Sequence, residues 1–120
     1  MTKILVIEDD EEIRVLIQRL LEREGFEVEA AEDGVKGMEA FRTWAPDMVI
    51  TDLVMPRMKG EETIREIRSI DAEAKIIAIS GGGPSTPSKL LEGARNAGAL
   101  ETLAKPFDPV ELLSAVHRLA

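Results

Sequence analysis

This sequence predicts an α/β domain built on one doubly wound, five-stranded parallel sheet with five helices. Short apolar runs rich in Ile and Val alternate along the chain with stretches of helical periodicity. Runs of this kind are typical of parallel strands that are buried on both faces. The chain has 120 residues, the usual size of one domain, so we assign residues 1–120 to a single domain.

The strands are expected where the apolar runs are short and are bounded by polar or turn-forming residues. In chain order, the expected strands are Ile4–Ile7, Phe26–Ala31, Met48–Ile50, Ile76–Ile79 and Leu100–Ala104.

The helices are expected where apolar residues recur three and four positions apart and capping residues mark the ends. The first carries an apolar stripe that Gly25 would close, formed by Ile13, Leu16, Ile17, Leu20 and Leu21. The next three are Val35–Trp44, Gly60–Ile70 and Leu90–Ala97. The Gly- and Pro-rich stretch 81–88 is expected to be a loop.

The last helix has the clearest start signal. Asp108 is expected as its N-cap, Pro109 at the first helical position and Glu111 as the reciprocal capping residue. Much of its buried face is expected to comprise Val110, Leu113, Val116 and Leu119.

The balance of charges and the absence of cysteine exclude several function classes. The net charge is −8, from 15 Lys and Arg against 23 Asp and Glu, so the surface lacks the positive field that direct nucleic-acid binding needs. With no cysteine, the chain has neither a disulfide nor a Cys-based metal or redox site. No apolar run approaches the roughly 18 residues of a membrane span. We therefore expect a soluble cytoplasmic protein without a membrane partner.

Polar residues follow four of the expected strands. Glu8 and Asp9 follow the first, Asp52 the third, Ser80 the fourth and Lys105 the fifth. In an open parallel α/β sheet, ligands bind outside the carboxyl ends of the strands. We therefore expect carboxylates, a hydroxyl and an ammonium to meet at one edge of the sheet.

These groups are the ones that phosphoryl transfer requires. Glu8, Asp9 and Asp52 would repel one another unless a cation lay between them. A hard ion that keeps some of its waters, such as Mg²⁺, suits a site with few protein oxygens. Lys105 offers a compact positive charge to an anion such as phosphate, and a carboxylate can act as a nucleophile to form an aspartyl-phosphate. Together they predict metal-assisted phosphoryl transfer onto a protein acid.

Each of these residues taken alone has a simpler structural explanation. The acids after the first strand suit a helix N-terminus, whose dipole favours negative charge. Asp52 would cap a turn, Ser80 would be a small turn residue, and Lys105 would be a surface lysine before a proline. Their coincidence at one sheet edge favours the functional interpretation.

Four segments together resemble the receiver domain of bacterial two-component response regulators. They are Ile4–Asp10, Asp52–Pro56 with Gly60, Ile76–Gly81, and Gly98-Ala99 followed by Lys105–Phe107. The resemblance covers essentially the whole chain, so residues 1–120 would form one receiver domain. It implies a flavodoxin-like sheet with strand order 2-1-3-4-5 and a cis peptide bond between Lys105 and Pro106.

The resemblance also implies the roles of the acids. Asp52 would accept the phosphoryl group and bind Mg²⁺. Asp9 would be a direct magnesium ligand, Glu8 would act mainly through water, and Val54 would give its backbone carbonyl to the metal. Asp10, one position later, is expected to belong to the helix start.

Around the phosphoryl group, the resemblance implies a hydrogen bond from Ser80 and an ion pair with Lys105. A sensor histidine kinase or phosphotransfer protein would donate the group. The chain would catalyse only its own phosphorylation and dephosphorylation. A downstream protein target or a fused output domain would read the change, and a phosphorylation-dependent homodimer is compatible with this scheme.

Two other functions stay open. A pseudo-receiver uses the same fold as an interaction module without phosphorylation, and loss of the acceptor, the acids or the lysine usually marks it. None is lost here. A phosphohydrolase of the haloacid-dehalogenase type needs a second acid two residues after its aspartyl nucleophile, where this chain has Val54.

One position departs from the family pattern. Thr102, three residues before Lys105, stands where the family usually has Tyr or Phe, whose ring moves inward on activation. The chain contains no tyrosine, so the usual aromatic readout is absent or replaced.

Overall fold

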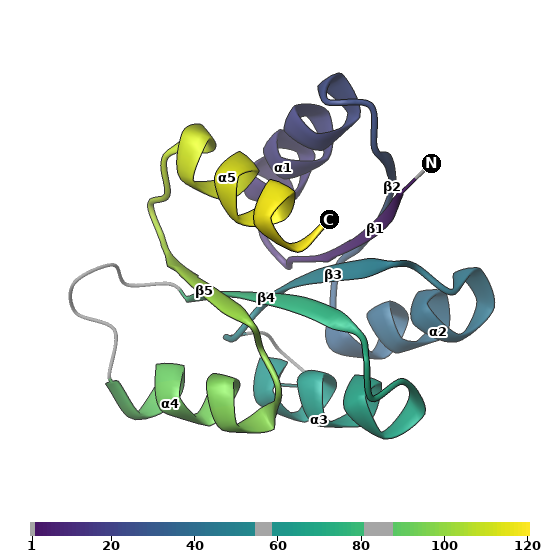
Figure 1. Cartoon of the computed structure of the whole chain (residues 1–120), viewed down its shortest axis with the longest axis vertical. Coiled ribbons are helices and arrows are strands. Elements are labelled where there is room, and N and C mark those ends of the chain that lie inside the picture. The colour runs from purple at the N-terminus through teal and green to yellow at the C-terminus, as the bar shows by residue number, and fades with distance from the viewer. Residues whose placement is uncertain (1, 55–58, 81–87) are drawn as a thin grey trace.

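The computed structural model describes residues 2–54, 59–80 and 88–120, with the side chains of 88–91 excepted. Strands and helices alternate along the chain, as predicted (Figure 1). The strands are β1 (Lys3–Ile7), β2 (Glu27–Ala31), β3 (Met48–Asp52), β4 (Lys75–Ser80) and β5 (Glu101–Ala104). The helices are α1 (Glu11–Arg23), α2 (Gly34–Trp44), α3 (Gly60–Ile70), α4 (Ser88–Ala97) and α5 (Pro109–Leu119). Ser88, expected in a loop, begins α4, and the rest of that stretch, 81–87, lies outside the described residues.

The strands form one parallel sheet in the order β2-β1-β3-β4-β5, which confirms the expected topology. Ile7 at the end of β1 pairs with Thr51 of β3, and Asp52 pairs with Ile79 of β4. Ser80 at the end of β4 pairs with Ala104 of β5. In this register the carboxyl ends of four neighbouring strands lie side by side, so the residues that follow them share one edge of the sheet.

The helices cover both faces of the sheet. α1 and α5 lie over one face, and α2, α3 and α4 lie over the other (Figure 1). Along β1, Ile4 and Val6 pack into one core together with Ile17 of α1, while Leu5 and Ile7 pack into the other core. This alternation follows from the period of two along a strand, and it explains why β1 is apolar throughout.

β2 and β5 contradict the prediction that every strand is buried on both faces. They are the edge strands of the sheet. Glu27 and Glu29 of β2 are exposed, and the residues of β5 are half-buried or exposed. An edge strand has a neighbour on one side only and less cover from the helices. Charged side chains on such a strand also discourage pairing with another chain.

The buried face of α5 is offset from the predicted one. Val110, predicted to be buried, is 69% exposed, whereas Leu112, Ala115 and Val116 are buried. The helix start is the predicted one, because Asp108 Oδ1 accepts a hydrogen bond from the Val110 amide at 2.8 Å, so the offset comes from how α5 packs on the sheet. Val116 is buried as predicted, and Leu113 and Leu119 are partly buried and pack against the same core as Ile17 of α1.

The apolar stripe of α1 is narrower than predicted. Ile17 and Leu21 are fully buried, and Ile13 and Leu20 pack at the edge of the core, but Leu16 is 46% exposed. With 13 residues, α1 is the longest helix of the described chain, and none of the described helices is long and apolar enough to cross a membrane.

Candidate functional site

Glu8, Asp52 and Lys105 reach one point because each continues the same face of its strand. Successive side chains of a strand point to opposite faces, so a residue shares its face with the residue two positions earlier. The residues two positions earlier all pack in the core under α1 and α5, and they are Val6, Ile50 and Leu103. The polar side chains therefore continue that apolar face at the carboxyl end of β3 and just beyond the ends of β1 and β5.

Lys105 connects the buried acids. Its Nζ lies 2.5 Å from Glu8 Oε1 and 3.3 Å from Asp52 Oδ2. The side chains of Glu8 and Asp52 are only 1% and 3% exposed, and that of Lys105 is 16% exposed. Because water screens these charges poorly, their attraction is much stronger than that of a surface ion pair.

Three carboxylates lie close enough together to bind one metal ion. Oxygens of Glu8, Asp9 and Asp52 all lie within 4.8 Å of one another, and Asp9 is open to solvent. Glu8 Oε1 is buried, and apart from its ion pair with Lys105 it has no hydrogen-bond partner among the described residues. A carboxylate oxygen has more than one lone pair, so a cation or its bound water would add to the contact that Lys105 already makes with Glu8 Oε1. The all-oxygen donor set fits a hard divalent cation such as Mg²⁺.

The pKa values of the three acids in the cluster are shifted in different directions. Burial raises the pKa of Glu8 from 4.5 to about 7, although the contact with Lys105 opposes this. Burial also raises the pKa of Asp52, again against the attraction of Lys105. For Asp9, burial acts in the same direction, but hydrogen bonds with Glu8 and Asp52 outweigh it and lower the pKa. Burial opposes the charge of Lys105, but its contacts with the two acids prevail and raise its pKa.

Ser80 and Val54 lie beside the cluster. Ser80 is fully buried, and its hydroxyl donates to the Leu103 carbonyl oxygen at 3.5 Å. It directly follows Ile79, the register partner of Asp52. The amide of Val54 donates to Asp52 Oδ1 at 3.4 Å, while its side chain is 59% exposed. Both residues are placed next to Asp52, and their roles toward a metal or a phosphoryl group stay predictions.

Two further neighbours support the backbone of the site. Asp10 is the N-cap of α1, because its Oδ1 accepts hydrogen bonds from the amides of Glu12 and Ile13 at 2.9 and 3.3 Å. Gly60 begins α3 directly against Asp52, where an added Cβ would lie 2.3 Å from the Asp52 carbonyl oxygen. Only glycine permits this close approach of two backbone segments.

Arg14 of α1 contacts the site but is not among the residues predicted from the sequence. Its Nη1 donates to the carbonyl oxygens of Glu8 at 3.0 Å and Asp9 at 3.4 Å. The available signal was weak. An arginine follows the acidic first turn of a helix, close to the end where the helix dipole disfavours a cation.

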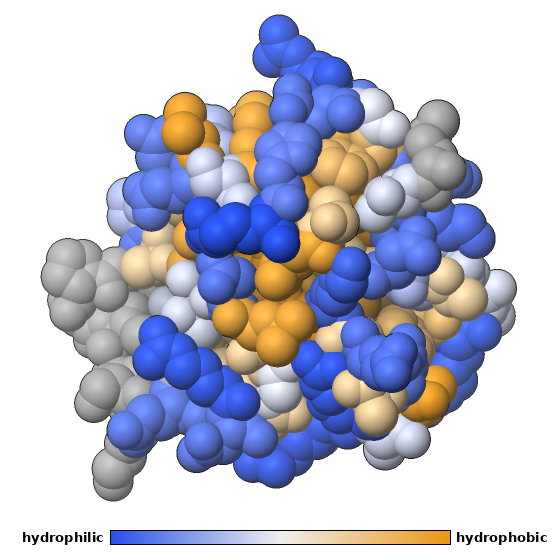
Figure 2. Space-filling model, in the orientation of Figure 1, coloured by the Kyte–Doolittle hydropathy of each residue, from blue (hydrophilic) through white to orange (hydrophobic). Residues whose placement is uncertain are grey.

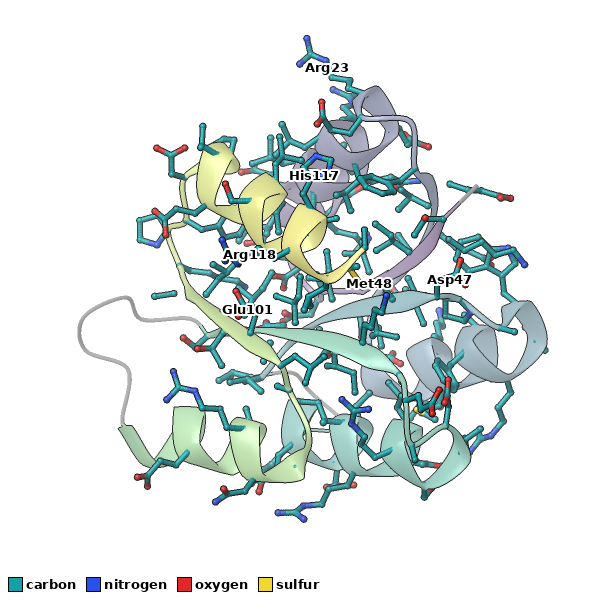
Figure 3. The ribbon with its side chains drawn as sticks, viewed as in Figure 1. Arg23, Asp47, Met48, Glu101, His117 and Arg118 are labelled. Carbon is teal, nitrogen blue, oxygen red and sulfur yellow. The ribbon has the colours of Figure 1, made fainter. Side chains whose placement is uncertain are left out.

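Polar contacts surround the position where the family pattern has an aromatic residue. Arg95 of α4 donates to Thr102 Oγ1 at 3.1 Å. At the preceding position, Glu101 Oε1 accepts hydrogen bonds from Arg118 Nε at 3.1 Å and Nη2 at 2.5 Å, and the two side chains point toward each other (Figure 3). Figure 2 shows a hydrophobic area between α5 and α4 with hydrophilic side chains around it. Thr102 therefore makes a polar contact with α4 at the position where the family usually has an aromatic ring.

Known proteins resemble the chain over nearly its whole length. Residues 4–117 match the family model for the response regulator receiver domain. The chain is 36% identical over 117 residues to the chemotaxis protein CheY of Bacillus subtilis strain 168, covering 97% of this chain and 95% of that relative. It is 35% identical over 117 residues to the response regulator MprA of Mycobacterium sp. strain KMS, covering 98% of this chain but 50% of that relative.

Solved structures show the same fold. The receiver domain protein from Clostridium thermocellum superposes with a TM-score of 0.90 at 34% identity, covering 99% of this chain and 94% of that chain. The chemotaxis response regulator CheY4 of Vibrio cholerae gives a TM-score of 0.90 at 30% identity, covering 100% of this chain and 99% of that chain.

Proposed function

Because this chain belongs to the response regulator receiver domain family of two-component signalling, we propose that Asp52 accepts a phosphoryl group and thereby switches the domain. The observation that carries this proposal is the position of Asp52, whose carboxylate meets the Lys105 ammonium beside two further acids. This arrangement combines a nucleophile, a set of oxygen ligands and a fixed positive charge.

In the proposed reaction, a carboxylate oxygen of Asp52 attacks the phosphorus atom of the donor, and the bond from phosphorus to the donor's leaving atom breaks. Lys105, already 3.3 Å from Asp52 Oδ2, pairs with the new phosphoryl oxygens. Ser80 turns its hydroxyl from the Leu103 carbonyl, 3.5 Å away, to donate to the same group. The product carries roughly −1.5 to −2 charges, by analogy with other phosphorylated residues.

The acid cluster is proposed to hold Mg²⁺. Asp9, Asp52 and the Val54 carbonyl would be direct ligands, and Glu8 would act mainly through water. When bound, the ion stabilises negative charge on the transferring phosphoryl oxygens. The close approach of the three carboxylates, two of which are buried, supports this assignment.

The proposal includes partners on both sides of the reaction. Receiver domains interact with histidine kinases and downstream effectors, so we propose a histidine kinase or phosphotransfer protein as the donor, acting in the cytoplasm. CheY has about the length of this chain, and MprA has about twice that length. We accordingly propose that a separate protein or a fused output domain binds the phosphorylated form. Phosphorylation-dependent homodimerisation is one form that this output would take. The domain would have no substrate other than its own aspartate.

The site counts against both alternatives. A pseudo-receiver has no need of the Asp52–Lys105 contact or of the metal-binding acids, and all of them are retained. For a phosphohydrolase, the second acid would stand at Val54, which has an exposed apolar side chain that cannot protonate a leaving group.

The proposal is tested by intact-mass measurement after incubation with acetyl phosphate. We expect the wild type to gain the mass of one phosphoryl group with Mg²⁺ and not with EDTA. Asp52→Asn should gain none, and Asp10→Asn should label normally because Asn also caps a helix. A wild type that takes no label, or an Asp52→Asn variant that does, contradicts the proposal. Steady release of phosphate from small phosphoesters would favour the hydrolase.

Mass is a better readout than tryptophan fluorescence in this chain. Trp44 lies at the end of α2, where its ring centroid is 5.4 Å from Nζ of Lys3, the first residue of β1. Asp52 is the last residue of β3, at the opposite end of the parallel sheet. A phosphoryl group on Asp52 therefore has no direct contact with the indole.

A further inference from the structure

We propose that Arg14 is a positioning residue for the cation site, and that it sets the Mg²⁺ affinity by fixing the backbone that carries Glu8 and Asp9. This inference rests on the proposed function, because it concerns the same acid cluster. Arg14 itself contributes no oxygen and would act only through the two acids.

Arg14 bonds to three consecutive carbonyl groups of the segment between β1 and α1. Its Nη1 donates to Glu8 O at 3.0 Å and to Asp9 O at 3.4 Å. Its backbone amide donates to Asp10 O at 2.9 Å, as part of the helix. One residue thus holds the backbone at every position from which an acid of this segment projects.

The other contacts of this segment hold its two ends, and Arg14 holds the peptide group between them. The Glu8 amide donates to Ala31 O at 3.0 Å, which attaches the start of the segment to β2. The Asp10 amide donates to Glu8 Oε2 at 3.2 Å, and Asp10 caps the helix. Between these anchors Asp9 is exposed, and its carbonyl oxygen accepts a hydrogen bond from the Arg14 guanidinium at 3.4 Å.

The chemistry of arginine suits this task. A guanidinium is planar, always charged and offers five N–H donors in a fixed fork. Its Nη1 can therefore donate to two neighbouring carbonyl oxygens at once. The ammonium of lysine is a compact point charge without this geometry, so lysine at position 14 would keep the charge and lose the fixed orientation.

Metal ligands depend on such supports. Removing an outer partner of a ligand typically weakens metal binding 10–100-fold, because the ligand must then be ordered when the metal binds. The same reasoning applies to a backbone that carries two ligands. We expect Arg14→Gln to raise the Mg²⁺ dissociation constant about 10-fold and Arg14→Lys to raise it less.

The test is calorimetric titration of the full chain with Mg²⁺, without any phosphoryl donor. Arg19→Gln is the matched control, since it removes the same charge from an exposed position of the same helix. We expect the control to bind within roughly twofold of the wild type. Thermal unfolding of each variant with EDTA separates a loss of affinity from a loss of folding.

Two further readouts distinguish positioning from a merely structural role. At saturating Mg²⁺, labelling of Arg14→Gln by acetyl phosphate should return to the wild-type rate. In an Asp9→Asn background, Arg14→Gln should raise the dissociation constant by a smaller factor than in the wild type, because one of the two acids that Arg14 positions is gone.

The outcomes separate this inference from the proposed function. A wild type that binds Mg²⁺ with an Arg14→Gln variant that binds equally well overturns the role of Arg14 alone. An equal loss in Arg19→Gln also overturns it, because the effect would then be one of general charge. A wild type that neither binds Mg²⁺ nor takes label overturns the proposed function, and this inference with it.

Discussion

Nζ of Lys105 lies 2.5 Å from Oε1 of Glu8, although one residue follows the last strand of the chain and the other follows the first. β1 and β5 are not neighbours in the sheet, so the lysine reaches across the ends of β3 and β4 to make this contact. The ammonium supplies positive charge to buried acids that would otherwise repel one another. We therefore expect the stability of the domain and the proposed chemistry of its site to depend on the same side chain.

Replacing Lys105 by methionine should destabilise the domain in a pH-dependent way. The change leaves Glu8 and Asp52 buried without their counter-charge, and breaking such a pair typically costs 3–5 kcal/mol. The loss should approach about 3 kcal/mol near pH 8 and be smaller near pH 5, where Glu8 is protonated. Urea unfolding in EDTA measures both values.

The control for this experiment is Lys75→Met, at an exposed position at the start of β4. A surface substitution of this kind usually changes the free energy of unfolding by less than about 0.5 kcal/mol. If Lys105→Met and Lys75→Met have equally small effects, the buried ion pairs do not stabilise the fold.

The metal-free domain should lose stability as the pH rises through neutrality. The pKa of Glu8 is about 7 in the fold against an ordinary value of 4.5, so the folded state binds this proton more tightly. The free energy of unfolding must then fall between these two pH values, by at most about 3 kcal/mol. The raised pKa of Asp52 acts in the same direction. The lowered pKa of Asp9 matters only below about 3.8, and the raised pKa of Lys105 only above 10.5.

Urea midpoints in EDTA, from about pH 5 to about pH 8, measure this effect. Glu8→Gln should show much less of the decline, and saturating Mg²⁺ should reduce it in the wild type because the ion favours the ionised acids. A flat wild-type profile, or the same decline in Glu8→Gln, would show that burial of Glu8 does not set the pH dependence.

Gly98→Ala should destabilise the domain more than Gly25→Ala. Both glycines have positive φ angles, +128° and +90°, where a side chain costs roughly 1–2 kcal/mol. At Gly25 an added Cβ meets nothing within 4 Å, but at Gly98 it would lie 2.4 Å from Arg68 Nε. It would thus displace the guanidinium that donates to Gly98 O and to Ala72 O.

We expect about 1 kcal/mol or more of additional loss for Gly98→Ala, from the hydrogen bonds that Arg68 gives up. Thermal or urea unfolding of the two variants side by side measures the difference. Equal losses would mean that backbone strain alone accounts for both substitutions.

The convergence of the site could be predicted from the sequence because it depends on local rules. Parallel strands end at one edge of a sheet, and side chains alternate along each strand. Those two rules predict that Glu8, Asp52 and Lys105 lie together, and in the structure Lys105 contacts both acids. The order of the strands came from the family resemblance, since the period of apolar residues does not say which strands are neighbours.

Features that depend on tertiary contacts were not predictable in this way. β2 and β5 are apolar enough to be read as buried strands, and only the sheet order shows that they form its edges. The exposure of Val110 depends on how α5 sits on the sheet. The contacts of Arg14 with Glu8 and Asp9 depend on the path of the chain between β1 and α1, which no periodicity describes.

The most direct measurement is to locate the phosphoryl group on the chain. The wild type is incubated with acetyl phosphate and Mg²⁺, the acyl phosphate is reduced with borohydride, and the modified residue is identified by peptide mass spectrometry. We predict reduction at Asp52 and at neither Glu8 nor Asp9. Modification at another acid of the cluster, or none in the presence of Mg²⁺, would contradict the assignment of Asp52 as the acceptor.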